Sequence, residues 1–350
     1  MNFIDNTKAC ELMNAYTSAR TPYIFIIDYK MQQCCVLKWD EVDASEWLYQ
    51  LEGVTNCSEE TANTLGGEMT YCSKEITDSL EETAEDAACQ WEPDFMSFAD
   101  YAACFDVVMR GLRRGDSFLT NLTVATPVRT DKDLKTLFSL AKARYKMWVK
   151  DCFAFFSPEI FVKVEGDVVA SYPMKGTIDA SIPNAYNVIL NDEKEKAEHA
   201  TIVDLIRNDL SMIASEVNVA RYRYADLIHT NRGDLLQISS EVTGKLPHDW
   251  QQQWGNLFFK LLPAGSICGA PKPRTLEIID EAETSPRGFY TGVAGYYDGN
   301  VFNSAVMIRF VEQTAAGLVF KSGGGITFQS DARSEYEEIK QKTYIPGAKQ

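Results

Sequence analysis

The sequence predicts an α+β fold in which antiparallel strands alternate with single helices. Apolar runs typical of strands come in neighbouring pairs joined by short turns, as in residues 160–164 and 168–172, which flank the turn at Gly166-Asp167. Segments with apolar residues at every third or fourth position, typical of helices, occur singly between such pairs. A regular strand–helix–strand repeat, which would predict a doubly wound parallel sheet, is missing from the pattern.

Residues 1–97 predict an abbreviated N-terminal region that packs on the core. Its clearest strand covers residues 23–28, and residues 35–39 are expected to pair with it across a short turn. Residues 52–94 are polar and acidic and have few periodic apolar positions. They therefore predict a surface insertion or a partly helical linker.

Residues 98–350 predict the larger, more regularly patterned domain of the chain. Helices are expected over residues 98–114, 134–150, 194–213, 271–282 and 334–342. Strands are expected over residues 117–124, 153–156, 160–164, 168–172, 292–297, 301–310 and 318–321.

The composition limits the classes of function. The chain has 350 residues, 45% of them hydrophobic, and its net charge of -16 disfavours nucleic acid and anionic membranes as partners. The N-terminus lacks the basic start of a signal peptide, and no stretch approaches the roughly 20 apolar residues of a membrane helix. The nine cysteines show no metal-binding spacing, so we expect reduced thiols and a cytoplasmic protein.

Lys175 and Glu159 form the first candidate site. Glu159 ends one predicted strand and Lys175 follows the next hairpin, so both side chains can meet at the same end of a sheet. A lysine acts as a nucleophile only as the neutral amine, which a nearby carboxylate disfavours. Glu159 therefore fits the role of an acid/base that exchanges protons with the substrate. The alternative is that Lys175 is an exposed turn residue.

Two sets of glutamates form the second candidate site. Glu195 and Glu198 share one helix face, and Glu335, Glu338 and Lys342 share another. Like charges on one face destabilise a helix unless they are solvated or bridged by a cation. Two such faces opposite each other would give an all-oxygen site that suits Mg²⁺. The alternative is two solvated acidic faces.

Three consecutive glycines, Gly323, Gly324 and Gly325, form the third candidate site. Their backbone N–H groups could converge on an anion, or the run could be a hairpin corner. Arg309 lies within an apolar strand pattern, where a charge needs a partner. A substrate carboxylate would suit its planar guanidinium.

Taken together, these segments resemble the chorismate-utilising enzymes, the family of anthranilate synthase, aminodeoxychorismate synthase and the isochorismate and salicylate synthases. The matching blocks occur in the family's order between about residues 98 and 346. They are residues 157–159, 173–177, 198–210, 262–272, 287–292, 308–309, 323–326 and 335–338. The resemblance implies a four-layer α/β/β/α core with two orthogonally packed, mainly antiparallel sheets. It also implies that residues 98–350 bind chorismate.

Within this family, lysine at position 175 is typical of component I of aminodeoxychorismate synthases of the best-studied kind, whereas anthranilate synthases usually carry alanine there. Gln237 agrees, because it stands where anthranilate synthases typically have histidine. The resemblance therefore implies that chorismate and ammonia are converted to 4-amino-4-deoxychorismate, a precursor of 4-aminobenzoate and folate.

The resemblance also implies the roles of the site residues. Lys175 would add at C2 of chorismate while the C4 hydroxyl leaves, with Glu159 as the general acid, and ammonia would then add at C4. Mg²⁺ would be held mainly by Glu198 and Glu338, with Glu195 and Glu335 close behind. The substrate-binding residues would be Gly176, Thr177, Ser266, Tyr290, Arg309, Gly323, Gly324, Gly325 and Lys342.

The partners follow from the same resemblance. No glutaminase signature is visible in the sequence, so a separate glutamine amidotransferase subunit (component II) would supply ammonia. The enzyme alternatives are anthranilate synthase component I and an isochorismate or salicylate synthase. A further alternative is an inactive relative kept as a binding or regulatory subunit, which the intact set of Lys175, Glu159, Glu198 and Glu338 disfavours.

Overall fold

The computed structural model describes residues 2–57, 70–71, 89–230 and 233–348. The chain divides into two compact units, each assembled from three separate segments of the sequence. The first unit contains Met1–Val36, Glu159–Ser266 and Val293–Val306. The second unit contains Leu37–Pro158, Ile267–Gly292 and Met307–Gln350.

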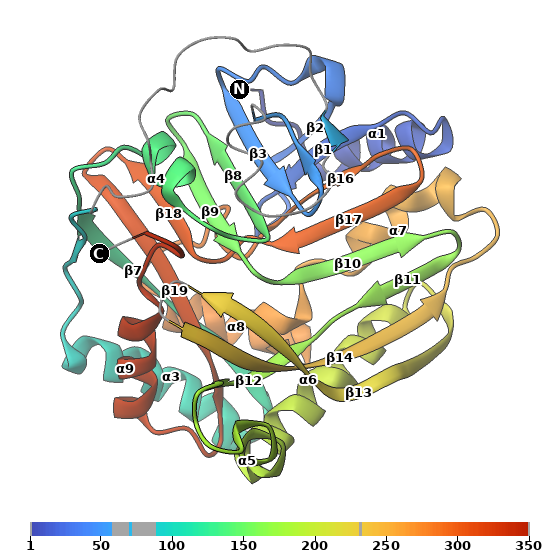
Figure 1. The fold of residues 1–350 in the computed structure, drawn as a ribbon. Helices are drawn as coiled ribbons and strands as arrows, with labels where there is room; N and C mark the ends of the chain where they lie inside the picture. Colours follow the sequence, from blue (N-terminus) through green and yellow to red (C-terminus); the bar gives the residue numbers. More distant parts are fainter. Residues whose placement is uncertain (1, 58–69, 72–88, 231–232, 349–350) are drawn as a thin grey trace. The chain divides into compact units, whose positions relative to one another are not determined.

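The first unit is built around an antiparallel sheet (Figure 1). Its strands are β1 (Tyr23–Ile27), β2 (Cys34–Lys38), β10 (Ile160–Glu165), β11 (Val168–Ser171), β12 (Met174–Asp179), β13 (Ser215–Thr230), β14 (Gly233–Lys245), β16 (Val293–Tyr297) and β17 (Val301–Val306). They are ordered β12-β14-β11-β10-β17-β16-β1-β2, and β13 pairs with the other edge of β14. Its helices are α1 (Asn6–Ser18), α5 (Ala185–Asn191), α6 (Glu193–Ser211) and α7 (Trp254–Lys260), with short 3-10 turns at Trp250–Gln253 and Gly265–Ile267.

The burial of β1 explains why it is an inner strand. All five of its side chains are buried, and β1 pairs with β16 in register from Tyr23 opposite Tyr297 to Ile27 opposite Val293. A continuous apolar run without alternation is typical of a strand covered on both faces. At the other end of this sheet, α5 and α6 pack against β12 and β14.

The second unit is built around a mainly antiparallel sheet. Its strands are β3 (Trp47–Leu51), β4 (Val54–Thr55), β5 (Thr70–Tyr71), β6 (Glu92–Pro93), β7 (Leu119–Arg129), β8 (Tyr145–Val149), β9 (Phe153–Ser157), β15 (Gly269–Ala270), β18 (Phe310–Thr314) and β19 (Gly317–Thr327). They are ordered β15-β7-β19-β18-β9-β8-β3-β4-β5, with β6 paired to β7, and β4 and β5 run parallel. Its helices are α3 (Phe98–Arg114), α4 (Leu134–Leu140), α8 (Lys272–Ala282) and α9 (Ala332–Lys342), with a 3-10 turn at Trp39–Glu41.

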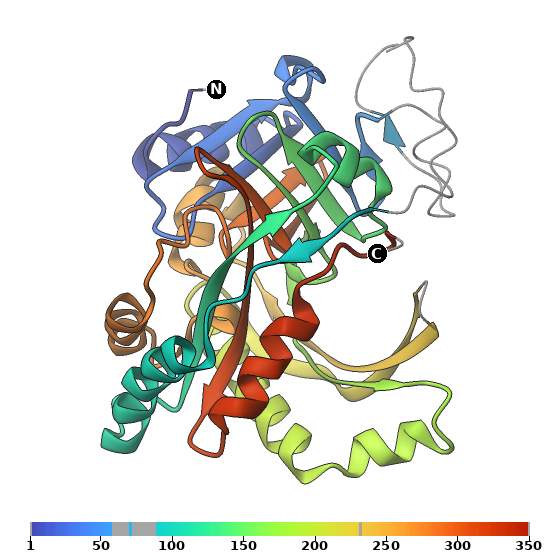
Figure 2. The same ribbon diagram turned by 90° about the vertical axis from the view of Figure 1, so that its left-hand side faces the viewer.

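In the second unit, α3 and α9 pack against each other and against β19 (Figure 2). The side chain of Ser97 caps α3 by accepting a hydrogen bond from the Asp100 amide, and Asp331 caps α9 in the same way with Ser334. α3 therefore begins where the sequence predicts, whereas α9 begins two residues before the predicted start at residue 334. Two mainly antiparallel sheets with single helices confirm the α+β class.

The helix expected over residues 134–150 is wrong in its second half. α4 ends at Leu140, and β8 lies within the sheet between β3 and β9. The Nζ atom of Lys146 is buried and donates hydrogen bonds to the carbonyls of Phe138 (3.0 Å) and Ala141 (2.8 Å) at the end of α4. Burial lowers the pKa of Lys146 to about 8. The sequence pattern suggests that Lys146 is an exposed helix residue. Its buried ammonium instead donates hydrogen bonds to carbonyls at the C-terminal end of α4 that have no partner within the helix.

The strand expected over residues 301–310 is also wrong, because it is two strands. β17 ends at Val306 and β18 starts at Phe310, with Arg309 between them in a left-handed conformation (φ +53°).

Most of the acidic stretch expected over residues 52–94 lies outside the described residues. Among the described residues, no helix is both long and apolar enough to cross a membrane.

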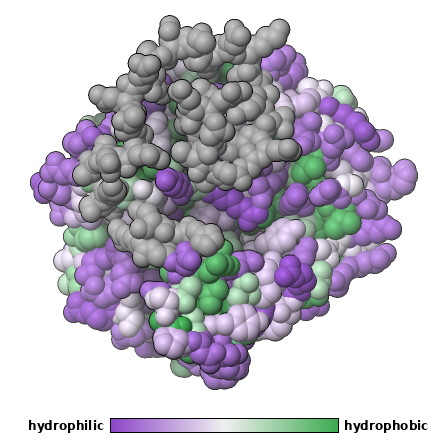
Figure 3. Space-filling view, in the orientation of Figure 1, coloured by the Kyte–Doolittle hydropathy of each residue, from purple (hydrophilic) through white to green (hydrophobic). Residues whose placement is uncertain are grey.

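The face drawn in Figure 3 is mainly hydrophilic, and its hydrophobic residues form small, separate patches. Charged residues make up 24% of the sequence, a proportion typical of globular proteins. The larger apolar side chains lie instead in the interior of each unit.

Candidate functional site

Lys175 lies at the start of β12, beside α6 of the same unit. Its Nζ atom is 3.4 Å from Oε2 of Glu198, which belongs to α6. The side chain of Lys175 is 28% exposed and that of Glu198 is 16% exposed. A half-buried ion pair between a strand and a helix requires both elements to be in place. The structure thus brings together the predicted nucleophile and a predicted metal ligand.

Gly176 places Glu195 next to the same stretch of β12. Its φ angle is +85°, and a Cβ atom there would lie 3.1 Å from Oε2 of Glu195 and 3.3 Å from Ile189. The side chain of Glu195 therefore reaches the backbone beside Lys175, where only glycine leaves room. Thr177 follows, is exposed, and pairs with Gln237 of β14.

Glu159 lies just before β10, at the end of the sheet where β12 begins. β10 and β11 pair in register with Lys163 opposite Ala170, and the Ser171 hydroxyl donates to the Phe161 carbonyl (2.7 Å). That Glu159 and Lys175 approach each other stays a prediction.

His199 is fully buried behind Glu198. Its Nε2 atom is 2.7 Å from the hydroxyl of Ser240, which also accepts a hydrogen bond from the Arg223 amide (2.9 Å). Burial and, after it, the positive charge of Arg223 lower the pKa of His199 to about 4. His199 is therefore neutral near pH 7 and adds no charge beside Glu198. The sequence did not predict the contact of His199 with Ser240 and Arg223, because these residues are far apart in the sequence and meet only when the sheet forms.

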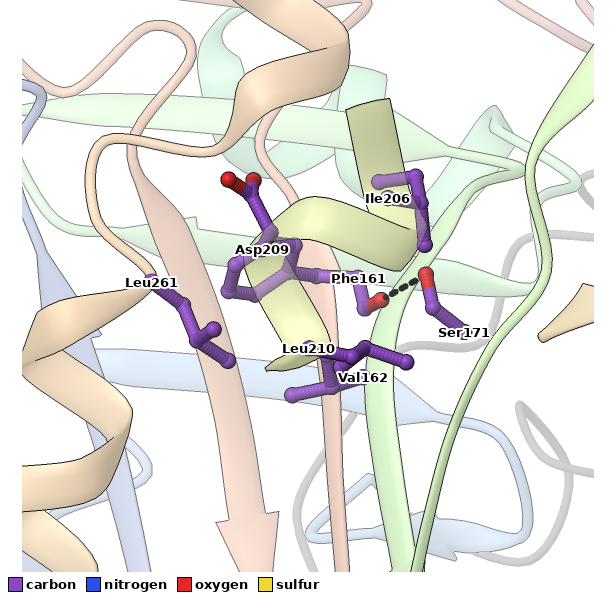
Figure 4. A pocket seen from close by; sticks show the side chains of 7 residues that line it. All are labelled: Phe161, Val162, Ser171, Ile206, Asp209, Leu210 and Leu261. Atoms are coloured by element: carbon purple, nitrogen blue, oxygen red, sulfur yellow. Dashed lines mark hydrogen bonds between the residues drawn. The ribbon is translucent and has the colours of Figure 1, made fainter. Parts of the chain in front are cut away.

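The C-terminal end of α6 supports the turn that carries Ser266. A Cβ atom at Gly265 would lie 2.6 Å from Oδ2 of Asp209, so that carboxylate lies against the turn's backbone. Asp209 also borders a small, mainly apolar pocket of the first unit, together with Ser171 (Figure 4). In that view the Asp209 carboxylate points away from Ser171, so the two do not form a polar pair in the pocket.

The second unit places Glu335 and Glu338 of α9 against Gly324 of β19. A Cβ atom at Gly324 would lie 3.3 Å from Oε2 of Glu335 and 3.9 Å from Oε1 of Glu338. Glu335 is only 5% exposed, whereas the side chain of Glu338 is 44% exposed. Lys342 is 2.5 Å from Glu338 and donates to the Gly323 carbonyl (3.3 Å).

The glycine run is neither an anion-binding nest nor a hairpin corner, so both local interpretations were wrong. Gly323, Gly324 and Gly325 lie inside β19 and pair in order with Thr123, Leu122 and Asn121 of β7. In an antiparallel strand, successive N–H groups point in alternate directions and cannot converge on one anion. Among them, Gly324 instead allows the α9 carboxylates to approach the strand closely.

Arg309 and Tyr290 also lie in the second unit. Nη1 of Arg309 donates to the carbonyl of Lys342 (3.0 Å), and its guanidinium lies 4.9 Å from the ring centre of Tyr344. Arg309 is thus held near the C-terminal end of α9. Tyr290 is buried, with its ring centre 6.0 Å from that of Phe310. A role for either residue in binding substrate stays a prediction.

The glutamate pairs have the chemistry of a site for a hard cation. Each pair offers only carboxylate oxygens, which Mg²⁺ prefers, and each faces a glycine where a Cβ atom would crowd the carboxylate. Within the part of the chain that the structure describes, no group of three or more His, Cys, Asp and Glu residues is close enough to hold a metal. Mg²⁺ binding therefore stays a prediction.

Comparison with known proteins places the chain in a family. Residues 2–346 match the family described as chorismate binding enzyme. A Haemophilus influenzae protein named "uncharacterized PabA-like protein" is 40% identical over 96% of this chain and 95% of its own length. Aminodeoxychorismate synthase component 1 of Bacillus subtilis is 27% identical over 98% of this chain and 73% of its own length.

A solved structure gives the same result. The crystal structure of anthranilate synthase component I from Streptococcus pneumoniae matches with a TM-score of 0.63 and 26% identity, over 73% of this chain and 59% of that chain. The family match covers nearly the whole sequence, and one relative is 40% identical over almost its full length. The chain therefore belongs to the chorismate-binding enzyme family.

Proposed function

We propose that this protein is component I of an aminodeoxychorismate synthase, which converts chorismate and ammonia to 4-amino-4-deoxychorismate. The position of Lys175 carries this proposal, because its amine lies 3.4 Å from Glu198, a proposed Mg²⁺ ligand. The Glu198 carboxylate alone would favour the ammonium form of Lys175, whereas Mg²⁺ bound to Glu198 would favour the neutral amine that the reaction needs. Similarity to the Bacillus subtilis component supports the same activity. Gln237, on the strand that pairs with β12, also supports amination through the lysine.

The proposed reaction of Lys175 and Glu159 has two steps. The amine of Lys175 forms a bond to C2 of chorismate while the C4 hydroxyl leaves as water with a proton from Glu159, and the proton that the lysine nitrogen then loses restores Glu159. Ammonia then bonds to C4, the bond between C2 and Lys175 breaks, and a proton from the ammonia nitrogen returns to the lysine. The lysine thus directs the amino group to C4.

Glu198 and Glu338 would hold Mg²⁺, with Glu195 and Glu335 close to them. Bound there, the ion would neutralise the ring carboxylate of chorismate and draw electron density from the ring. Gly176, Thr177 and Ser266 would line the substrate site. Tyr290, Arg309 and Lys342 would bind substrate carboxylates.

A separate glutamine amidotransferase subunit is the proposed source of ammonia. No glutaminase signature is visible in the sequence, so glutamine alone should not support the reaction. The similarity to the Streptococcus pneumoniae structure favours anthranilate synthase component I as the second candidate.

Product identity tests the proposal. The purified protein is incubated with chorismate, Mg²⁺ and an ammonium salt, and the products are separated by chromatography. 4-Amino-4-deoxychorismate is the expected product. Anthranilate as the main product would overturn the proposal in favour of the second candidate, and isochorismate would show that water replaces ammonia. Glutamine in place of ammonium serves as the control for the missing subunit.

A further inference from the structure

Arg223 lies at an irregularity of β13, the strand that pairs with the outer edge of β14. Between Arg221 and Tyr224, β13 has one more residue than the paired stretch of β14. The φ angle of Arg223 is +47°, which is unfavourable for a residue with a Cβ atom. Such bulges redirect a side chain, and a strained residue persists only where the surrounding structure holds it. The contacts of Arg223 therefore indicate what the bulge is for.

The guanidinium of Arg223 holds the end of α5. Its Nη1 atom donates to the Leu190 carbonyl (2.9 Å) and its Nη2 atom donates to the Ile189 carbonyl (3.3 Å). Carbonyls in the last turn of a helix have no partner within the helix, and a positive charge stabilises that end. α5 ends at Asn191 and α6 begins at Glu193, so Arg223 also fixes the junction of the two helices.

The backbone of Arg223 reaches α6 through Ser240. The Arg223 amide donates to the Ser240 hydroxyl (2.9 Å), and this hydroxyl lies 2.7 Å from Nε2 of His199 on α6. Ser240 and His199 are both fully buried, so solvent does not compete for these hydrogen bonds. One bulged residue of β13 therefore contacts α5 directly and contacts α6 through a single side chain.

Both helices meet β12 beside Lys175. A Cβ atom at Gly176 would lie 3.3 Å from the side chain of Ile189 on α5 and 3.1 Å from the carboxylate of Glu195 on α6. Glu198 follows on α6, with Oε2 3.4 Å from Nζ of Lys175. A shift of the α5–α6 junction would therefore change the packing next to Lys175 and move the carboxylate that pairs with it.

We propose that Arg223 is a positioning residue for Lys175, because it holds α5 and α6 against β12 so that the Lys175 amine stays beside Glu198. The placement rests on contacts within the first unit. Its consequence for the reaction rests on the proposed function, in which Lys175 is the nucleophile. Arg223 acts through the two helices and not by contact with the substrate.

The test compares the reactivity of Lys175 in the wild-type protein, Arg223→Met and Ser240→Ala. Each protein is treated briefly with acetic anhydride at one pH, well below its unfolding temperature. Peptide mass spectrometry then gives the acetylation rate of Lys175 relative to that of Lys150, whose side chain is 46% exposed in the second unit. Arg223→Met should raise this ratio by at least about threefold, because loosened helices open the amine to the reagent. Ser240→Ala should also raise the ratio, because it removes the link to α6.

Arg221→Met is the matched control. Arg221 lies on the same strand, but its guanidinium lies 3.8 Å from the ring centre of Tyr224. The ratio in this variant should equal that of the wild type. Equal ratios in the wild type and Arg223→Met overturn the inference, as does an equal rise in Arg221→Met. If Arg223→Met does not fold, an unchanged ratio in Ser240→Ala overturns it.

Kinetic measurements connect the placement of the amine to the reaction. With chorismate, Mg²⁺ and ammonium, Arg223→Met should lower kcat by about 10- to 100-fold while KM for chorismate stays within about twofold, because the nucleophile is misplaced and the groups that bind chorismate remain. A raised KM with unchanged kcat contradicts the positioning role. A raised acetylation ratio combined with anthranilate as the product would overturn the proposed function and leave the placement of Lys175 by Arg223 standing. An unchanged ratio with 4-amino-4-deoxychorismate as the product would overturn this inference alone.

Discussion

Each unit places a glutamate pair, a glycine and a lysine together, but by different means. In the first unit, Glu195 and Glu198 of α6 meet Gly176 and Lys175 of β12. In the second unit, the pair on α9 meets Gly324 of β19, and its lysine lies four residues further along the same helix. The ion pair in the second unit joins residues four apart on one helix, although Lys342 also donates to the Gly323 carbonyl of β19. The ion pair of Lys175 requires the strand and the helix to fold together, so its position belongs to the tertiary structure.

The largest expected effect comes from removing the lysine that the fold positions. Lys175→Ala should reduce formation of 4-amino-4-deoxychorismate by roughly 10³-fold or more, because the proposed nucleophile is lost. Incubation with chorismate and Mg²⁺ without ammonia, followed by intact-mass measurement, should show an adduct on the wild type and none on the variant.

Lys196→Ala is a suitable control for that prediction. Lys196 lies on the same helix, α6, and pairs with the exposed Glu193. The Lys196→Ala protein should keep both the adduct and the rate. Normal rates with ammonia in Lys175→Ala, together with no adduct on the wild type, would show that Lys175 is not the nucleophile.

An intermediate effect on the free energy of unfolding is expected from replacing glycine by alanine, and it should be larger at Gly176 than at Gly324. At Gly176, alanine must adopt a positive φ angle and its Cβ atom would press on Glu195 at 3.1 Å, so the free energy of unfolding should fall by about 1–2 kcal/mol. At Gly324 no positive φ angle is recorded, and the nearest atom is the Glu335 carboxylate at 3.3 Å, so the loss should be less than about 1 kcal/mol. Urea unfolding measures both variants. An equal or larger loss at Gly324 would contradict the distinction.

The sequence predicted the helical faces, because these depend on the spacing of residues close together in the chain. The apolar stripe of α6, formed by Ile202, Leu205, Ile206 and Leu210, is buried, as the helical period requires. The glutamate pairs lie on the expected helices for the same reason. The strand order, which brings Glu159 towards the beginning of β12, could be anticipated only as a possibility.

The features that the sequence missed depend on distant partners. Lys146 is a buried strand residue because carbonyls at the end of α4 accept its hydrogen bonds, and its spacing alone suggests a surface helix. The glycine run forms a strand because β7 pairs with it along its length. Ser240 reaches His199 across 41 positions of sequence. None of these contacts has a periodic signal, since each is made by the assembled sheets.

The smallest expected effect on the free energy of unfolding comes from replacing Lys342, which lies four residues after Glu338 on α9. The side chains of Lys342 and Glu338 are 33% and 44% exposed, and exposed pairs four residues apart on a helix contribute about 0.3–0.5 kcal/mol. Lys342→Met should therefore lower the free energy of unfolding by no more than about 0.5 kcal/mol. About 0.5 M sodium chloride should reduce even that difference, because salt screens exposed charges. Urea unfolding at low and high salt measures it. A salt-independent loss several times larger would mean that the hydrogen bond from Lys342 to the Gly323 carbonyl contributes more than the helical ion pair, and the contrast between the two units would no longer hold.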